Sequence, residues 1–371
     1  MNKHRNRLSR REFLKTSSLA AAAACLSSVP WAGRVFAASS TTLRIGVIAP
    51  SHCALPLVHA SLTNAYKKND VKAEIVYLPD TLDIAKGLNR GELHAGQIIS
   101  PVFFSMVAGS GPFKGNQTSL VTAQVGGTNG GVLVVGANSG ITLPTELAGK
   151  SIGVHSPLMV HSLLINMLLK RHGIDPVSGV TRKTITMGKL IPALKSNEID
   201  AFINPEPLGT VAISGGAGKE LVLTKNLWFR HPCCLVAVRE NFYREEPETV
   251  KSFYLSSLES GLILNNVSTR NEALKRIHMD AKPYNAISAS AMQKAFTPGR
   301  TDFDPFPYQS SGKAVLRMMK ESNLLPASVD IDQMTSKTIL SDLSRQLLKK
   351  LGDNPPPTNN RQEKIVGEIM A

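Results

Sequence analysis

The chain has 371 residues and a formal net charge of +14, with 42% hydrophobic and 19% charged residues. This composition is typical of a globular protein, and the length is sufficient for two domains with separate cores. The first 37 residues hold seven lysines and arginines against one glutamate, so the rest of the chain is only modestly basic. A modest basic excess favours anionic ligands or surfaces. No basic run is interleaved with aromatic residues, and the sequence therefore predicts no nucleic-acid partner.

The beginning of the chain has the pattern of an export signal. Residues 9–15, SRREFLK, match the twin-arginine signature at every position, and an alanine-rich run and a small-residue cleavage site ending at Ala37 follow. Residues 1–37 are therefore predicted to be a signal peptide that is read by the twin-arginine translocase and leads to the periplasm. Lipid anchoring at Cys25 is the disfavoured alternative. No later run reaches the ~20 apolar residues of a membrane span, so the mature protein is predicted to be soluble.

Short apolar runs alternate with helical patterns along the mature chain, which is typical of α/β proteins. The helix at 158–170 is apolar on nearly every side and is predicted to be buried against a sheet. The chain's end begins with Asp-Asn-Pro-Pro-Pro, so residues 353–371 are predicted to be a flexible tail. Strands are expected at 42–49, 71–78, 95–99, 120–124, 131–135, 150–154, 199–203, 220–223 and 234–238, and helices at 55–68, 82–88, 158–170, 189–196, 246–265, 271–276 and 310–321.

Two segments of the chain are repeated. Residues 45–47 match 152–154, and residues 88–95 match 194–201, at offsets of 107 and 106. The near-constant offset predicts two Rossmann-like lobes with a ligand cleft between them, at the carboxyl ends of the strands. The alternative is that any two α/β segments look alike. Lobe 1 is assigned to residues 42–130 plus 235–352, and lobe 2 to residues 131–234.

Two of the polar candidates lie near the start of a predicted helix. Ser156 and His161 are close to the amino end of the helix at 158–170, where free N–H groups and a partial positive charge favour an anion or polar group. Taken alone, His161 also fits a core histidine that bonds to the backbone. Gln124 ends a predicted strand, where it fits a structural amide as well as a ligand contact.

Other candidates follow predicted strands. Ser51, His52 and Cys53 form a loop after the first strand, where ligand contact and simple capping are both open. Glu206, in an Asn-Pro-Glu-Pro turn, fits a ligand contact, a cation site or a cap of the following helix. Cys233 belongs to an adjacent cysteine pair that fits a soft pocket wall or an inert buried thiol.

The cysteines do not show the pattern of a metal site or of a disulfide framework. The mature chain has three, Cys53 and the adjacent Cys233 and Cys234, and adjacent cysteines rarely bridge each other. None has the paired spacing of a zinc site. The sequence therefore predicts no metal and no cofactor.

Several of these segments resemble a known family. The loop at 50–55, the run from His161 to the Gly-Ile-Asp-Pro turn at 173–176, the segment 193–207 and the Trp228…His231-Pro232 motif resemble solute-binding proteins of ATP-binding-cassette (ABC) importers. The resemblance is to the nitrate/bicarbonate type and, more distantly, to sulfonate, taurine and thiamine-precursor binders. It implies a monomeric periplasmic binding protein of the type II architecture. Such a protein closes on a small solute and delivers it to a permease and ATPase in the inner membrane, without catalysis.

The resemblance also implies site residues, one position at a time. Gln124, His161 and Thr81 fit positions at which the nitrate binders contact their anion. Three positions depart from that pattern. Leu78 stands where a tryptophan is expected, Pro205 stands for a glycine, and Cys233 falls where a charged residue helps to select the anion. These departures favour a solute other than nitrate itself.

Two further functions are kept as alternatives. A periplasmic sensor could use the same two-lobed fold to inform a signalling partner. A secreted hydrolase is disfavoured because the sequence has no Gly-x-Ser-x-Gly elbow, and Cys53 beside His52 lacks a third orienting group.

Overall fold

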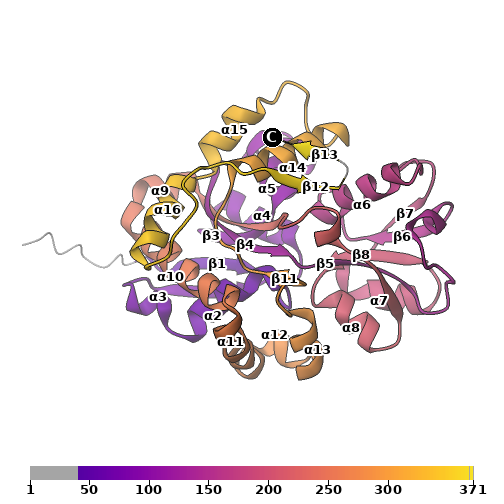
Figure 1. Ribbon diagram of the computed structural model, residues 1–371. Coiled ribbons are helices and arrows are strands. Elements are labelled where there is room, and N and C mark those ends of the chain that lie inside the picture. The colour runs from indigo at the N-terminus through magenta and orange to yellow at the C-terminus, as the bar shows by residue number, and fades with distance from the viewer. Residues whose placement is uncertain (1–40, 367, 371) are drawn as a thin grey trace, which may run out of the picture. The chain divides into compact units, whose positions relative to one another are not determined.

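The computed structural model describes residues 41–366 and 368–370 (Figure 1). The predicted signal peptide, with its twin-arginine motif, its cleavage site and Cys25, lies outside the described residues. None of the described helices is long and apolar enough to cross a membrane.

Six strands form the first sheet, in the order β11-β4-β10-β3-β1-β2. Parallel pairing of β1 with β2 and β3 brings their carboxyl ends to one edge, and antiparallel β10 brings its amino end to that same edge. Loops at this edge are therefore the ones that can meet a ligand. The strands are β1 (Leu43–Val47), β2 (Ala73–Tyr77), β3 (Ala95–Ile99), β4 (Leu120–Asn129), β10 (Pro232–Arg239) and β11 (Thr301–Asp302).

Five strands from the middle of the chain form the second sheet, in the order β7-β6-β8-β5-β9. β6 is parallel to β7 and β8, while β5 is antiparallel to β8 and β9. The repeated sequences occupy equivalent places in the two sheets, since Ile45 pairs with Ala95 and Ile152 with Ala201. The strands are β5 (Gly131–Gly136), β6 (Ser151–Val154), β7 (Thr181–Thr184), β8 (Ala201–Pro205) and β9 (Gly218–Leu223).

The predicted α/β architecture with two sheets is confirmed, with local differences. The chain re-enters the first sheet at Pro232, before the predicted boundary at residue 235, so Cys233 and Cys234 belong to that sheet. β4 continues to Asn129, beyond the predicted strand at 120–124. The predicted helix at 55–68 is divided because Asn64 adopts a left-handed conformation with φ 57°. The assignment of whole domains to these boundaries stays a prediction.

Helices cover the sheets, and several of them were not predicted from the sequence (Figure 1). The unpredicted ones include α5, which directly follows β3 and continues its apolar run, and α8, which begins after the turn that ends β8. The helices longer than four residues are α2 (Leu55–Leu62), α4 (Thr81–Arg90), α5 (Ser100–Ala108), α6 (Val160–Arg171), α7 (Met187–Lys195), α8 (Leu208–Ser214), α9 (Glu240–Glu245), α10 (Pro247–Asn265), α11 (Val267–Asp280), α13 (Ala289–Ala295), α14 (Gln309–Glu321), α15 (Ile331–Thr338) and α16 (Ser341–Lys350). The shorter ones are α3 (Ala65–Lys68) and α12 (Lys282–Asn285), with 3₁₀ turns η1 (His52–Ala54), η2 (Gly111–Phe113), η3 (Pro144–Leu147) and η4 (Thr224–Asn226).

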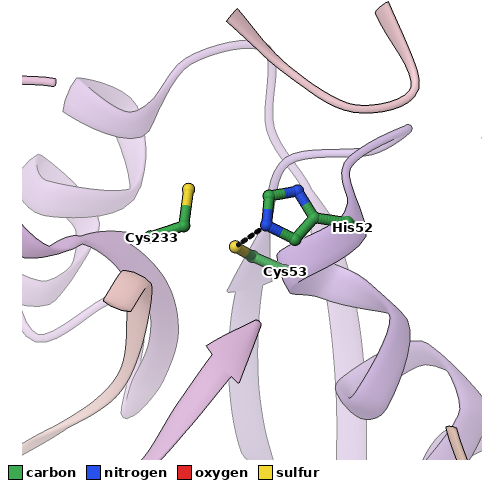
Figure 2. Close-up of side chains that lie close together, drawn as sticks. All are labelled: His52, Cys53 and Cys233. Carbon is green, nitrogen blue, oxygen red and sulfur yellow. Dashed lines mark hydrogen bonds between the residues drawn. The ribbon is translucent and has the colours of Figure 1, made fainter. Parts of the chain in front are cut away.

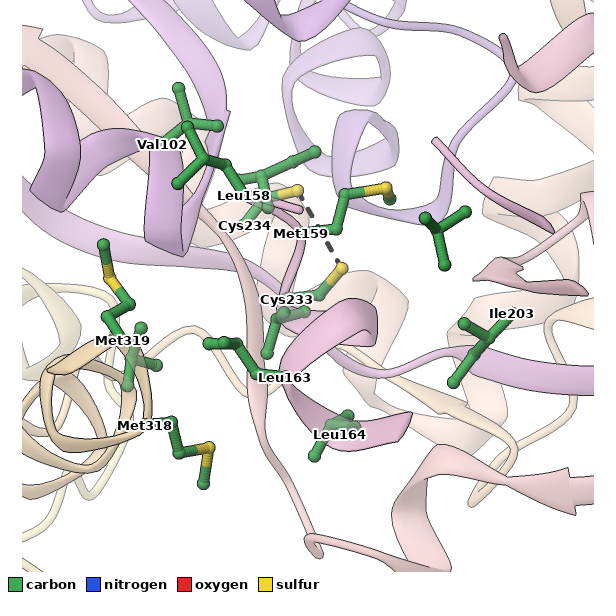
Figure 3. Close-up of a cluster of buried hydrophobic side chains, with 14 of the residues drawn as sticks. Val102, Leu158, Met159, Leu163, Leu164, Ile203, Cys233, Cys234, Met318 and Met319 are labelled. Carbon is green, nitrogen blue, oxygen red and sulfur yellow. Dashed lines mark hydrogen bonds between the residues drawn. The ribbon is translucent and has the colours of Figure 1, made fainter. Parts of the chain in front are cut away.

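One apolar cluster joins elements of both sheets. Leu163 and Leu164 of α6 are buried together with Val102 of α5 and Met319 of α14 (Figure 3). Cys233 is part of the same cluster. The prediction that the α6 segment is buried on most of its surface is confirmed, because eight of its twelve residues are buried.

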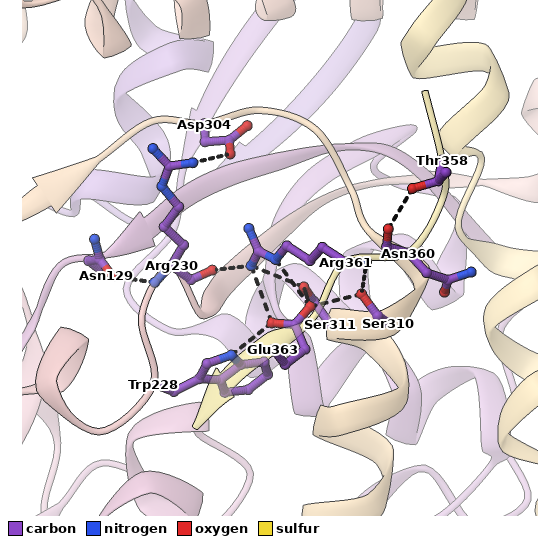
Figure 4. Close-up of polar contacts among 10 residues, drawn as sticks. All are labelled: Asn129, Trp228, Arg230, Asp304, Ser310, Ser311, Thr358, Asn360, Arg361 and Glu363. Atoms are coloured by element: carbon purple, nitrogen blue, oxygen red, sulfur yellow. Dashed lines mark hydrogen bonds and ion pairs between the residues drawn. The ribbon is translucent and has the colours of Figure 1, made fainter. Parts of the chain in front are cut away.

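The C-terminal segment is packed, although residues 353–371 were predicted to be a flexible tail. The carboxylate of Glu363 is buried and accepts hydrogen bonds from Trp228 Nε1 at 2.9 Å, Ser310 Oγ at 2.8 Å and Ser311 Oγ at 2.6 Å, and it pairs with Arg361 (Figure 4). The prediction of a loose tail is corrected for residues 361–366. The prolines do break regular structure, but partners far away in the sequence hold the segment that follows them.

Candidate functional site

The candidate site lies where the loop after β1 meets the end of β8. His52 is in η1, directly after β1, and its backbone N–H donates to the carbonyl of Glu206 at 3.1 Å. Glu206 follows β8 and its own N–H donates to the carbonyl of Gly130 at 2.7 Å. Both links come from carboxyl ends of strands, one in each sheet, which is the predicted position of a ligand site in this kind of fold.

Two glycines allow two imidazoles to approach the backbone that joins the sheets. Gly130 has φ 61°, and a Cβ there would lie 2.6 Å from Nε2 of His52. A Cβ on Gly131 would lie 2.5 Å from Nε2 of His161. Both distances are far below van der Waals contact, so any side chain at either position would displace an imidazole.

His161 is the predicted site residue whose environment points most clearly to a ligand. Its side chain is completely buried, and neither ring nitrogen has a hydrogen-bond partner among the described residues. Buried polar groups nearly always have partners, so two unpartnered nitrogens on one ring require an explanation. Burial, together with repulsion from His52, lowers the pKa of His161 to about 3. The imidazole is therefore neutral at pH 7, with one donor and one acceptor.

His231 completes a group of three buried histidines, and the sequence did not assign it to the site. Its ring lies 6.2 Å from that of His161, measured between centroids. The hydroxyl of Thr224 donates to the carbonyl of Gly131 at 3.0 Å and lies 2.9 Å from His231 Nε2, so Nε2 is the protonated nitrogen. Nδ1 is then an acceptor that has no partner within residues 41–366. The His-Pro motif was noted only as a resemblance, and nothing local to it indicated this contact.

The three histidines make the stability of the protein depend on pH. Burial lowers the pKa of His52, His161 and His231, so the folded state binds fewer protons than the unfolded state below the ordinary value of 6.5. Stability therefore rises with pH up to that value and is lost as pH falls below it. We expect the free energy of unfolding to fall by about 1.4 kcal/mol per pH unit for each histidine that stays neutral. Urea unfolding between pH 7 and pH 5 measures this slope, and a flat profile would contradict it.

Glu206 is buried, but its carboxylate already has partners. Oε2 accepts from Thr210 N at 2.9 Å and Oε1 from Thr210 Oγ1 at 2.8 Å, so Glu206 caps the start of α8. Arg300 reaches the same carboxylate from the segment before β11, with Nη2 2.6 Å from Oε1. Burial raises the pKa of Glu206, and Arg300 opposes that rise. These contacts favour the alternative in which Glu206 caps the following helix. The neighbouring Pro205, another predicted site residue, is half-buried and pairs with Gly131 across the sheet.

Gln124 is not brought together with the histidines. Its Nε2 donates to the carbonyl of Ser257 at 3.0 Å, and its Oε1 accepts from the Ser257 hydroxyl. Both polar groups are thus used by α10, which packs on the first sheet. These contacts favour the structural alternative for Gln124, which the sequence could not show because it does not indicate which helix faces the strand.

The remaining predicted residues lie around the same edge. Ser51 Oγ accepts from Gln97 Nε2 at 3.2 Å, and Leu78 is partly buried after β2. Thr81 is buried with its hydroxyl unpartnered among the described residues. Ser156 Oγ accepts from Leu158 N at 3.1 Å, but α6 begins only at Val160, so Ser156 stands before the helix rather than at its cap.

A hydrogen-bonded contact that the sequence did not predict joins the ends of β2 and β6. His155 Nε2 lies 3.0 Å from Oδ2 of Asp80, which also caps α4. The hydrogen bond from His155 and the bond from the Leu82 backbone lower the pKa of Asp80, against the effect of its partial burial. This pair is a second contact between loops of the two sheets.

The thiols of Cys53 and Cys233 lie beside His52. Cys53 Sγ is 3.2 Å from His52 Nε2, Cys233 Sγ is 4.0 Å from Cys234 Sγ, and all three cysteines are free and buried. Burial is the largest cause that raises the pKa of Cys53. Figure 2 shows that His52 and Cys53 are neighbours in η1, whereas Cys233 comes from β10.

Sequence comparison finds that the chain is similar to solute-binding proteins. A model of the NMT1-like family matches residues 37–278. The chain is 23% identical to the nitrate/nitrite binding protein NrtA of Nostoc sp. strain PCC 7120, with 93% of this chain and 90% of that protein covered. It is 24% identical to the nitrate import ATP-binding protein NrtC of Synechocystis sp. strain PCC 6803, over 62% of this chain. That match spans only 36% of NrtC.

Structural comparison agrees with the fold. The crystal structure of the periplasmic nitrate-binding protein NrtA from Synechocystis PCC 6803 has a TM-score of 0.79 and 19% identity, and it covers 88% of this chain and 94% of that one. The predicted architecture of a periplasmic binding protein is therefore confirmed.

Proposed function

Because the chain belongs to the NMT1-like family, we propose that it is the solute-binding component of an ABC importer. In this proposal the protein binds a small solute where the two sheets meet and passes it on unchanged. The observation that carries the proposal is His161, whose completely buried ring lies beside the backbone that joins the sheets and has two nitrogens without a partner among the described residues. A buried polar group without a partner costs about 1–3 kcal/mol, and a solute that bonds to it recovers that cost.

The chemistry of the site favours a small solute with oxygen acceptors. Lowered pKa values keep His52 and His161 neutral, so each supplies one N–H donor without a full charge. Nitrate, which the NrtA relatives are named for binding, has the planar oxygens that such donors fit, and bicarbonate or a sulfonate has similar groups. Leu78 and Cys233, at positions where the resemblance implies a tryptophan and a charged residue, are uncharged, which favours a solute other than nitrate itself.

The proposed partners follow from the relatives. The match to NrtC, an import ATPase, supports delivery to a membrane permease with its own ATPase. A periplasmic location, reached by the twin-arginine pathway, and a monomeric state complete the proposal. Signalling through the same fold is not favoured by any contact described above.

A thermal-shift screen tests the function. Nitrate, nitrite, bicarbonate, taurine, alkanesulfonates and pyrimidine precursors are added separately to the exported chain. A solute that binds only the folded state stabilises it by about 2.7 kcal/mol at 100 times its Kd, which raises the Tm. A solute that raises the Tm is then incubated with the protein and recovered. Chemical conversion of that solute, or no Tm increase with any of them, would overturn the proposal.

His161→Leu separates a ligand contact from a structural histidine. The change removes two unpartnered nitrogens from a buried site, so we expect the solute-free protein to be as stable as the wild type or more stable. Solute affinity should nevertheless fall by about 1–3 kcal/mol, because the solute loses a hydrogen bond. Calorimetric titration measures the affinity. His278→Ala, on α11, is the control and should bind normally. Unchanged affinity in the leucine variant would remove His161 from the site.

A further inference from the structure

Three ligand atoms of the kind that zinc prefers converge in the candidate site. The thiols of Cys53 and Cys233 and an imidazole nitrogen of His52 all lie within 4.8 Å of one another. The three side chains are 0%, 1% and 0% exposed, respectively (Figure 2). Two residues come from η1 and one from β10, about 180 positions apart, which is why cysteine spacing in the sequence indicated no metal.

The fold holds these groups close to a coordination geometry. With Zn–S bonds of about 2.3 Å and a Zn–N bond of about 2.0 Å, tetrahedral ligand atoms are roughly 3.5–3.8 Å apart. Cys53 Sγ and His52 Nε2 are already 3.2 Å apart. A shift of about 1 Å, which side-chain rotation supplies, would bring Cys233 Sγ to the same separation. The backbone on either side is fixed, because Ser100 Oγ donates to the carbonyl of Pro232 at 3.0 Å and His52 N donates to Glu206.

We propose that His52, Cys53 and Cys233 form a zinc-binding site. Two thiolates and a neutral imidazole carry a charge of −2, which one Zn²⁺ neutralises, and a neutral site suits a buried position. Thiolate ligands disfavour Mg²⁺ and Ca²⁺, which prefer oxygen. Cys234 Sγ, 4.0 Å from Cys233 Sγ, is a fourth donor within reach, and it accepts from Gln97 Nε2 at 3.5 Å.

A zinc site would also explain why the polar side chain of His52 is buried with an unsatisfied ring nitrogen. Its Nδ1 is buried and has no partner among the described residues, while Nε2 faces a thiol. When Nε2 coordinates zinc, Nδ1 carries the proton and is free to donate to a neighbouring solute. Two ligands lie in η1, which follows β1, and the third lies in β10. The backbone N–H of His52 donates to the carbonyl of Glu206, which follows β8. Zinc binding does not depend on the proposed transport function.

Zinc titration tests the proposal on the exported chain, reduced and freed of metal. Competition with a chromophoric chelator should give one tightly bound Zn²⁺ per chain. Co²⁺ in place of zinc should give intense thiolate-to-metal charge-transfer absorption, which reports sulfur ligands without any mutation. Cys53→Ser and Cys233→Ser should each weaken zinc binding by about 100-fold or more, since even the loss of an outer partner of a zinc ligand costs 10–100-fold. His59→Gln, at an equally buried histidine on α2, should bind zinc as the wild type does.

Any of three results from these measurements would overturn the zinc site. These are no stoichiometric zinc in the wild type, wild-type affinity in both serine variants, or cobalt binding without charge-transfer absorption. A disulfide between Cys53 and Cys233 in the purified protein, found by thiol counting and peptide mass spectrometry, would equally overturn it. Cu⁺ is titrated in parallel, and binding of Cu⁺ without Zn²⁺ also counts against the assignment. Solute binding is measured separately on metal-free protein, so failure of the zinc site is distinguishable from failure of the transport proposal.

Discussion

Glu363→Ala is expected to lower the free energy of unfolding by about 3–5 kcal/mol, the usual cost of breaking a buried charge pair. The buried carboxylate accepts from Trp228 Nε1, from two serine hydroxyls and from Arg361, so its removal leaves several donors without an acceptor at once (Figure 4). Urea unfolding, followed by Trp fluorescence and circular dichroism, measures the loss.

Two variants make this result specific to the carboxylate. Glu363→Gln keeps the shape and one acceptor oxygen, and we expect a smaller loss than with alanine. Lys364→Ala changes the next, exposed residue and should stay within about 0.5 kcal/mol of the wild type. A loss below about 1 kcal/mol in Glu363→Ala would mean that the C-terminal segment contributes little to the fold.

Arg300→Ala is expected to destabilise the protein by a similar amount, about 3–5 kcal/mol at pH 7, because it leaves the completely buried Glu206 without its countercharge. The pKa of Glu206 is already raised by burial and should rise further in the variant. A carboxyl whose folded pKa is above its unfolded value binds more protons in the folded state. The loss relative to wild type should therefore be largest at pH 7 and shrink as pH falls towards the ordinary value of 4.5.

The controls for Arg300 use its two partners. Glu220→Gln removes only the more exposed partner and should cost no more than about 1 kcal/mol. Adding Glu206→Gln to Arg300→Ala removes the unpaired charge and should recover part of the stability at pH 7. A loss in Arg300→Ala that does not depend on pH would show that packing of the arginine, and not its charge, stabilises this position.

The sequence predicted the parts of the fold that depend on local pattern. Apolar runs such as residues 95–99 gave the buried strands, and the repeated segments gave two similar sheets. The break in the helix at Asn64 was missed. Glycine is the usual sequence signal of a left-handed residue, and here an asparagine adopts that conformation instead. α8 was missed because the Asn-Pro-Glu-Pro turn suggested an end and not the cap of a new helix.

The candidate site was predicted only where its residues follow strands. The expected edge, at the carboxyl ends of the parallel strands, is where the structure places His52, Cys53, His161 and Glu206. The structural contact of Gln124 was not foreseen because its partner, Ser257, is 133 residues away. His231 was omitted from the site because its contact with His161 also joins distant parts of the chain. The metal site formed by His52, Cys53 and Cys233 was missed for the same reason. Contacts between distant segments decide which polar groups are free, and a single sequence does not contain that information.

The attachment of the C-terminal segment has a consequence for biosynthesis. Residues 227–229, between β9 and β10, pair with residues 364–366, with Val366 N donating to Leu227 O at 2.8 Å and Phe229 N to Lys364 O at 3.1 Å. The linker between the sheets can therefore complete this packing only after residues 364–366 have also emerged from the ribosome. The connection between the two sheets is thus completed later in synthesis than the strands on either side of it.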